Sequence, residues 1–266
     1  MKFVVTTLSI GKNYTKDYTC RLIKDVLEKT NNDIYITTDC DDVIENQFGK
    51  QERIKIQKIK KEDIKLRIKI GNYSDDFNFN MRYLCLKPVK DLEDAIVIFT
   101  DCDNSFDWWD DAVVTRFIEE KGKDGYDFYG PRMSYIWRNF LDDYKSQNKK
   151  EYGIFWHKIL NYRLDVNSNE WDNAPLPAEY LLIFDNRGKK LNKFYDQWKW
   201  FHDHLVNMES SFGTWAEGFE IGVSSYIAGF KGYDIGWNHD IWSRIFCANG
   251  YKTGPRGGIV HQTERG

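Results

Sequence analysis

The stretch AIVIFTDCDNSF, residues 95–106, carries the pattern that decides the fold class. Residues 95–100 are apolar or β-branched without interruption, which is typical of a strand buried on both faces of a parallel sheet. The strand runs directly into Asp101-Cys102-Asp103. Open α/β sheets bind ligands beyond the carboxyl ends of their strands, so we expect this motif at a ligand-binding edge.

Alternating strands and helices precede this strand. Residues 2–10, 33–39 and 52–59 each predict a strand. Residues 15–30 and 80–92 predict helices between them. This order predicts an α/β fold with a Rossmann-like first half and a central sheet flanked by helices.

After residue 106 the segments are longer, more aromatic and less periodic. Residues 178–184 predict a further buried strand, and residues 190–208 and 213–233 predict two helices. No repeat, low-complexity segment or linker interrupts the chain. We expect one domain, residues 1–266, whose two parts, 1–106 and 107–266, serve different purposes.

Composition narrows the class of protein. The 266 residues suffice for one sizeable domain, and the five cysteines are widely spaced with no CxxC pair, which favours a reducing, cytoplasmic compartment. No stretch approaches 18 apolar residues, so no membrane span is expected. The net charge is −3, which gives no general attraction for polyanions. Aromatic residues make up 16% of the chain, and such residues form cores or platforms for sugar and base rings.

The motif at residues 101–103 suits a metal site. In an extended chain Asp101 and Asp103 would share one side, while Cys102 would turn back toward the sheet. Two carboxylates supply hard oxygen ligands for a divalent cation, which could in turn hold a diphosphate. The alternative is a polar turn in which an aspartate caps a backbone amide.

This layout resembles that of the GT-A glycosyltransferases, in which a DxD motif binds manganese or magnesium and the diphosphate of a nucleotide-sugar. The resemblance implies a single GT-A-like domain with a mixed central sheet. Residues 1–106 would bind the donor, a UDP-linked sugar, and residues 107–266 the acceptor. Asp101 and Asp103 would bind the metal, and Asp101 would also contact the donor.

The sequence GIVHQT near the C-terminus is the second match, because many GT-A enzymes bring a C-terminal His to the metal. The resemblance implies that His261 is this ligand, and an imidazole beside two carboxylates favours manganese. His239 is a competing candidate. The alternative is that His261 is an ordinary surface residue near a frayed end.

The third match is TWAEGFEI, residues 214–221. GT-A enzymes commonly place an acid at the start of a helix in this region, which implies catalytic roles for Glu217 and Glu220. Inverting members usually follow the first acid with Asp, whereas this chain has Gly218, so retention is slightly favoured. The alternative is that Glu217 only stabilises the first turn of a helix.

Several other residues take roles from the same resemblance. An acid at the end of the second strand, Asp39, would contact the base or ribose. Arg82 and Lys87 would contact the pyrophosphate or sugar hydroxyls, or are surface cations with buried stems. The remaining donor contacts lie at the end of the first strand: Thr6, Thr7 and Ser9.

The acceptor is predicted from rings interleaved with cations in the second part of the chain. These residues are Trp137, Arg138, Trp156 and Trp215. A glycan or glycoprotein is the favoured acceptor, and a DNA duplex with a hydroxymethylated base is an alternative. Two other functions stay open, a nucleotidyltransferase and a non-catalytic sugar-binding module.

Overall fold

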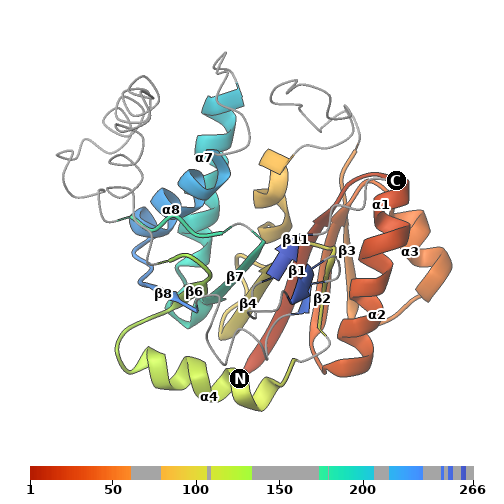
Figure 1. Ribbon diagram of the computed structural model, residues 1–266. Coiled ribbons are helices and arrows are strands. Elements are labelled where there is room, and N and C mark those ends of the chain that lie inside the picture. Colours follow the sequence, from red (N-terminus) through yellow and green to blue (C-terminus); the bar gives the residue numbers. More distant parts are fainter. Residues whose placement is uncertain are drawn as a thin grey trace.

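A computed structural model describes residues 1–60, 79–106, 109–133, 174–178, 180–206, 216–235, 247–248, 251–253 and 259–261. Within these residues, the chain forms a seven-stranded sheet in the order β3-β2-β1-β4-β7-β6-β8 (Figure 1). The predicted α/β fold with a mixed central sheet is confirmed, and its arrangement is consistent with a Rossmann-like nucleotide-binding fold. None of the helices in the described ranges is both long and apolar enough to cross a membrane.

The first half of the sheet is parallel. Its strands are β1 (Lys2–Ser9), β2 (Asp33–Thr38), β3 (Ile54–Lys58) and β4 (Ala95–Thr100). The helical segments between them are α1 (Lys12–Tyr14), the π-helical turn η1 (Thr15–Thr19), α2 (Cys20–Lys29), α3 (Asp41–Phe48) and the 3₁₀ helix η3 (Phe79–Leu86). The strands fall where the sequence predicts them.

The second half contains a reversed strand. β7 (Leu181–Asp185) runs antiparallel to both β4 and β6 (Phe128–Gly130), and β8 (Gly232–Asp234) runs parallel to β6. The other elements are β5 (Asn104–Ser105), α4 (Asp111–Gly122), η5 (Asn186–Gly188), α7 (Leu191–Val206), α8 (Ala216–Ala228), β9 (Cys247–Ala248), β10 (Tyr251–Thr253) and β11 (Ile259–His261). β5 pairs with β9, and β10 with β11.

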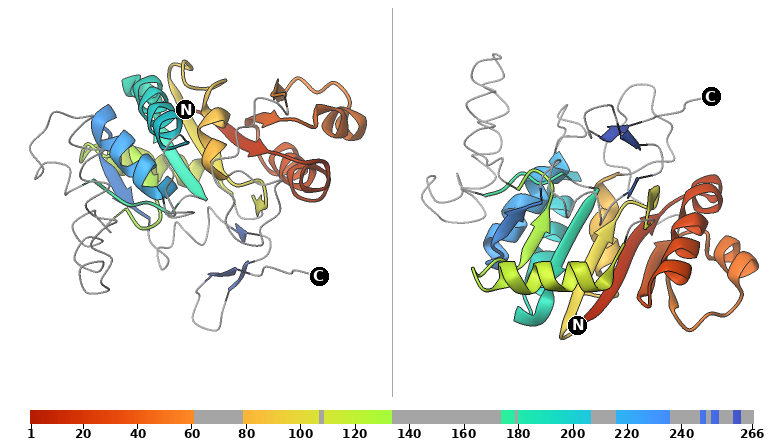
Figure 2. Two further views of the ribbon diagram at one scale, coloured as in Figure 1. Left: turned by 90° about the horizontal axis from the view of Figure 1, so that it is seen from above. Right: turned by 60° about the horizontal axis from the view of Figure 1, so that its bottom comes forward.

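Helices cover both faces of the sheet, and Figure 2 shows α4 and α7 on opposite sides of it. The side chains of β4 alternate between two core clusters. Ile96 and Ile98 pack with residues of α2 and α4, while Val97 and Phe99 pack with residues of η3, α7 and α8. Every residue of β4 is buried. The prediction from its uninterrupted apolar run is confirmed.

An arginine in the connection before β3 binds the C-terminal end of helix α2. The Arg53 guanidinium donates to the carbonyl oxygens of Leu27 at 3.0 Å, Thr30 at 2.8 Å and Asn32 at 2.8 Å, and also to that of Val26. The last carbonyls of a helix lack intrahelical donors and carry the negative end of the helix dipole. Arg53 therefore satisfies the end of α2 and fixes it to the connection before β3.

Helix α4 was not expected from the sequence. Asp110 caps it, because its Oδ1 accepts hydrogen bonds from the backbone N–H groups of Ala112 at 2.9 Å and Val113 at 3.2 Å. Its inner face is Val114, Phe117 and Ile118. The spacing of these three residues is helical, but Thr115 and Arg116 divide the apolar residues into two short stretches, which gave a weak signal. The aromatic segment 149–162, whose sequence predicts strands and loops, lies outside the described residues.

Candidate functional site

Three neighbouring parallel strands end at one edge of the sheet, β2 at Thr38, β1 at Ser9 and β4 at Thr100. The acids that follow, Asp39 and Asp101, therefore lie on either side of the end of β1. The N-terminus marks the opposite edge, with α4 (Figure 1). The DxD motif is at the strand edge where ligand sites of open α/β sheets are found.

A tight turn presents the motif. The backbone N–H of Asn104 donates to the carbonyl of Asp101 at 3.2 Å, and its side-chain Nδ2 donates to the carbonyl of Tyr180 at 3.0 Å. Extended backbone through the motif, the sequence expectation, is wrong because the strand ends one residue before it. Cys102 does turn inward and is 1% exposed. Asp101 and Asp103 stay partly exposed on either side of this anchor.

Two guanidinium groups flank the turn. Arg82, on η3, donates from Nη2 to Oδ2 of Asp101 at 3.1 Å. Both side chains are largely buried, at 11% and 20% exposure, so this pair is screened less than a surface ion pair. Arg21, on α2, donates from Nη2 to the carbonyl of Asp103 at 3.3 Å. Arg82 is one of the residues predicted from the sequence to contact the donor, whereas Arg21 is not.

Two neutral groups adjoin the carboxylates. Burial raises the pKa of the Tyr14 phenol well above its usual range, and the nearby Cys102, Asp103 and Asp101 raise it further. Burial likewise raises the pKa of the Cys102 thiol to about 12. Both groups keep their protons at neutral pH.

Tyr14 and Arg21 had no signal in the sequence. Tyr14 belongs to α1 and Arg21 to α2, and both lie far from the motif along the chain. The parallel pairing of β1 with β4 brings α1 and α2, which follow β1, beside residues 101–103.

Asp39 stabilises the connection after β1. Its Oδ1 accepts from the backbone N–H of Gly11 at 2.8 Å and from the Cys40 thiol at 3.3 Å. Gly11 has φ +91°, a conformation that glycine adopts without strain. Residues 39–41 repeat the Asp-Cys-Asp tripeptide of residues 101–103. The second acid of this copy, Asp41, pairs with Lys58 at 2.8 Å. Contact of Asp39 with a base or ribose stays a prediction.

The three polar residues predicted at the end of β1 are fully buried. Thr6 Oγ1 donates to the carbonyl of Cys85 at 2.5 Å, and the Ser9 hydroxyl bonds that of Thr19 at 2.6 Å. Thr7 Oγ1 has no hydrogen-bond partner among the described residues. The hydrogen bonds of Thr6 and Ser9 join β1 to η3 and to the π-helical turn η1. Contact of these hydroxyls with a nucleotide stays a prediction.

The predicted metal set is described only in part. Asp101 and Asp103 supply two carboxylates, but the described side chains contain no group of three or more His, Cys, Asp or Glu arranged to hold a metal. The backbone of His261 lies in β11, opposite Tyr251, and its side chain is outside the described residues, as is His239. Lys87 is exposed on the turn after η3.

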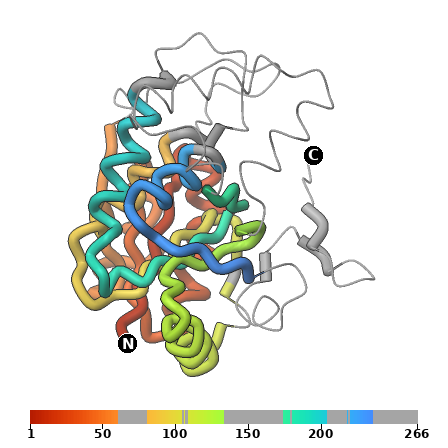
Figure 3. The backbone as a smooth tube through the Cα atoms, turned by 90° about the vertical axis from the view of Figure 1, so that its left-hand side faces the viewer, coloured from red at the N-terminus to blue at the C-terminus, as the bar shows by residue number. Residues whose placement is uncertain are grey.

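The direction of helix α8 places the backbone of Glu217 at the carboxyl edge of the sheet. α8 leads into β8, which runs parallel to β6, so the first turn of α8 lies at the carboxyl edge. Glu220, one turn further, is fully buried between α7 and α8, where Trp198 Nε1 donates to its Oε2 at 3.2 Å. The two helices lie next to each other in Figure 3. Glu220 is thus buried in the structure, and a catalytic role for it stays a prediction.

The predicted acceptor residues are not placed. Trp137, Arg138, Trp156 and Trp215 all lie outside the described residues. The turn of residues 101–104, in contrast, lies within the described residues.

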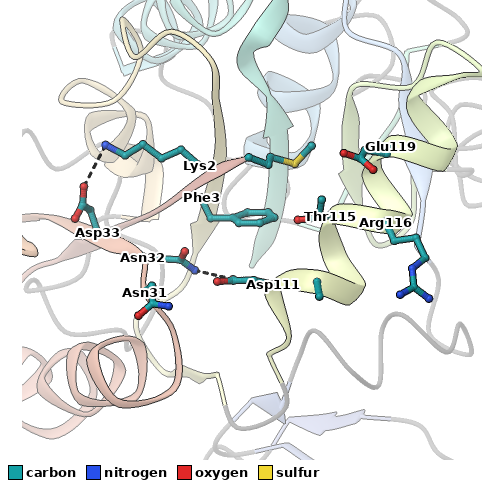
Figure 4. Close-up of a pocket in the computed structure, with 11 residues that line it drawn as sticks. Lys2, Phe3, Asn31, Asn32, Asp33, Asp111, Thr115, Arg116 and Glu119 are labelled. Atoms are coloured by element: carbon teal, nitrogen blue, oxygen red, sulfur yellow. Dashed lines mark hydrogen bonds and ion pairs between the residues drawn. The ribbon is translucent and has the colours of Figure 1, made fainter.

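A cavity of about 810 Å³ opens at the opposite edge of the sheet, where β1 begins. Figure 4 shows polar residues along its wall that pair with each other. Lys2 Nζ lies 3.3 Å from Asp33, and Asn32 Nδ2 donates to Asp111 at 3.2 Å. None of the predicted site residues lines this cavity. We therefore place the candidate site at the turn formed by residues 101–104.

No protein-family model and no curated protein matches the chain. Among solved structures, it is similar to the bifunctional IspDF from Campylobacter jejuni, with 13% sequence identity and a TM-score of 0.40. The match covers 89% of this chain and 50% of that one, so this chain spans half the length of that protein. A likeness at this level assigns neither an activity nor site residues.

Proposed function

We propose that the protein is a metal-dependent transferase acting on a nucleotide-activated substrate, and that the group it transfers is a sugar from a nucleoside diphosphate, UDP in the first instance. The observation that carries the proposal is the turn that presents Asp101 and Asp103 at the carboxyl edge, between Arg82 and Arg21. Carboxylate oxygens suit Mn²⁺ and Mg²⁺. The Arg82 guanidinium beside Asp101 indicates that this position accepts a cation.

Several of the predicted residues would then take part in binding the donor. When bound, the divalent cation would offset the charge that develops on the leaving diphosphate. Arg82 and Arg21 would bind phosphate oxygens, for which a planar guanidinium is well suited. Asp39 would bind the base or ribose, with Lys87 near the sugar. His261 would complete the metal ligands.

Glu217 is the proposed catalytic carboxylate. The dipole at a helix N-terminus keeps a carboxylate ionised and able to accept a hydrogen bond from a hydroxyl group. The position after it is Gly218, which offers no base for direct displacement with inversion. We therefore favour retention of the anomeric configuration.

Nucleotidyl transfer is the second candidate. The same edge and the same paired acids would bind a metal–triphosphate, and the two arginines match its more negative charge. Against it, only Ile10 and Gly11 separate β1 from the following helix, which leaves no room for a long phosphate-binding loop there.

A glycan or glycoprotein is the proposed acceptor, bound by Trp137, Arg138, Trp156 and Trp215. Binding of a neutral oligosaccharide would depend little on salt, whereas binding of a DNA duplex would weaken steeply as salt increases. Affinity for both ligands at low and moderate salt, with Trp137→Ala and Arg138→Ala, distinguishes these acceptors.

The deciding experiment is a paired assay with Mn²⁺ or with EDTA. UDP release is measured with a panel of UDP-sugars, and pyrophosphate release is measured with the four nucleoside triphosphates. Metal-dependent UDP release supports sugar transfer, and pyrophosphate release supports nucleotidyl transfer. If the protein binds sugars without turnover, and Asp103→Ala leaves that binding intact, it is a non-catalytic sugar-binding module and the proposal is wrong.

A further inference from the structure

Arg82 lies where an incoming cation would have to bind. Its guanidinium contacts Oδ2 of Asp101 at 3.1 Å, and that carboxylate is one of the two proposed metal ligands. A divalent cation bound to Asp101 would lie within a few ångströms of the positive charge of Arg82. The repulsion between the two cations would be poorly screened, because the Arg82–Asp101 pair is largely buried. Metal binding and the ion pair therefore compete for the same carboxylate.

The backbone that carries Arg82 is held firmly. Its neighbours Met81 and Tyr83 are 3% and 6% exposed. The η3 carbonyl of Cys85 accepts from Thr6 of β1, which joins the helix to the centre of the sheet. We therefore expect the Arg82 side chain to move by rotating about its own bonds while the backbone of η3 keeps its place.

The formal charges of four described side chains at the turn balance in two states. Without metal and donor, Asp101 and Asp103 carry two negative charges, and Arg82 and Arg21 carry two positive charges. A divalent cation alone leaves an excess of two positive charges, and a nucleoside-diphosphate sugar brings two negative charges that remove this excess.

We propose that Arg82 is an exchangeable counter-ion, which neutralises Asp101 in the free protein and moves to the diphosphate when metal and nucleotide bind together. The divalent cation then binds tightly only when a nucleoside diphosphate is present. This inference rests on the proposed function, since it concerns how the same carboxylates take up metal and donor.

The experiment measures binding and not turnover. Mn²⁺ affinity is determined by the electron paramagnetic resonance signal of free Mn²⁺, without nucleotide and with saturating UDP, in the intact protein. For the unsubstituted protein, UDP should tighten Mn²⁺ binding by at least about 10-fold, within the usual range of coupling between two ligands. Asp101→Asn should weaken Mn²⁺ binding under both conditions.

Arg82→Gln separates the exchange from a merely structural ion pair. Removing the guanidinium should tighten Mn²⁺ binding without UDP by about 5-fold or more, and should reduce the tightening caused by UDP by about 10-fold. Arg82→Lys keeps the charge and should retain weak binding of Mn²⁺ alone. The matched control is Arg116→Gln, an exposed arginine on α4 at the opposite edge, which should change neither value.

The outcomes distinguish the two proposals. If the unsubstituted protein binds Mn²⁺ neither alone nor with UDP, the proposed function fails. If Mn²⁺ binds equally tightly with and without UDP, or if Arg82→Gln weakens binding of Mn²⁺ alone while Arg82→Lys restores it, the exchange is wrong and metal binding by the aspartates stands. Melting temperatures identify variants that fail to fold, in which case Arg82→Lys decides.

Discussion

Asp103 and Asp41 are chemically matched residues, because each ends an Asp-Cys-Asp tripeptide. Asp103 lies at the proposed metal site, whereas Asp41 opens α3 and pairs with Lys58. We expect Asp103→Asn to weaken Mn²⁺-dependent UDP binding by at least about 10-fold, on the order of the loss of one electrostatic group in a site. Titration calorimetry with UDP in the presence of Mn²⁺ measures this loss.

Asp41→Asn is the control for that measurement and should bind UDP normally. Equal losses in both variants, or none in either, would show that the position of the DCD tripeptide has no bearing on binding. The sequence repeats the tripeptide, and only the fold separates the two copies.

The residues of the site could be predicted from the sequence only where the signal is local. The pair Asp101 and Asp103 could be found because it directly follows an apolar strand. Arg21 could not, because its contact with Asp103 depends on the pairing of β1 with β4. The contact of Glu220 with Trp198 could not be predicted either, because a helix position alone does not reveal which face packs against a neighbouring helix.

At the scale of single elements, Arg53 tests how α2 is held. Arg53→Gln removes a charged donor from the carbonyls of Leu27, Thr30 and Asn32. We expect a loss of about 2–3 kcal/mol in the free energy of unfolding, since hydrogen bonds from charged groups and the helix dipole both contribute. Urea denaturation measures it. Lys55→Gln, which changes an exposed cation on the following strand β3, should cost little, and equal effects would refute the capping role.

Gly222 of α8 tests a close approach between two segments. A Cβ at this position would lie 1.7 Å from the carbonyl oxygen of Pro175, which is backbone and cannot rotate away. We expect Gly222→Ala to destabilise the protein by about 2–4 kcal/mol, through overpacking in a buried contact.

Gly122, the last residue of α4, supplies the matched control. A Cβ there would meet nothing within 4 Å, so Gly122→Ala should be neutral or stabilising by up to about 1 kcal/mol. Thermal melting of both variants checks the pair. A Gly222→Ala protein as stable as Gly122→Ala would show that residues 174–178 do not pack on α8.

The helices and strands of the first half could be predicted because their apolar residues recur at clear intervals. The elements of the second half were harder to predict from the sequence. β4 reads as a buried strand from its own residues. The direction of β7 could not be read in the same way, since an apolar strand looks alike in either orientation and only pairing with β4 and β6 sets it. Helix α4 could not be predicted because its three inner residues, Val114, Phe117 and Ile118, are too few to establish a helical period.

For the whole molecule, buried phenols and thiols predict loss of stability in alkali. Burial raises the pKa of Cys102 to about 12 and of Tyr195 to about 12, and it raises that of Cys40 to about 11. The unfolded chain ionises these groups at lower pH, so it releases more protons than the folded chain above about pH 9. The free energy of unfolding should be steady near neutrality and fall as pH rises from about 9 to 12.

Cys102 alone should account for about 2 kcal/mol of this loss near pH 10.5. Urea midpoints at pH 7.5, 9 and 10.5 measure the decline, each value being taken with a reducing agent present. A Cys102→Ala protein should decline less steeply. A midpoint that stays constant up to pH 10.5 would contradict the burial of these groups.

The pairing of β4 with β7 also determines the order in which the chain can fold. β1, β2 and β3 pair with one another across short connections, so these contacts form after short loops close. β4 meets both β1 and β7 only across long stretches of chain, which makes these pairings slow for entropic reasons. Refolding should therefore pass through a state in which the β1–β3 unit is protected from hydrogen exchange while the amides of β4 and β7 still exchange freely, and in that state the open edge of β1 would be the surface most prone to pair with another chain.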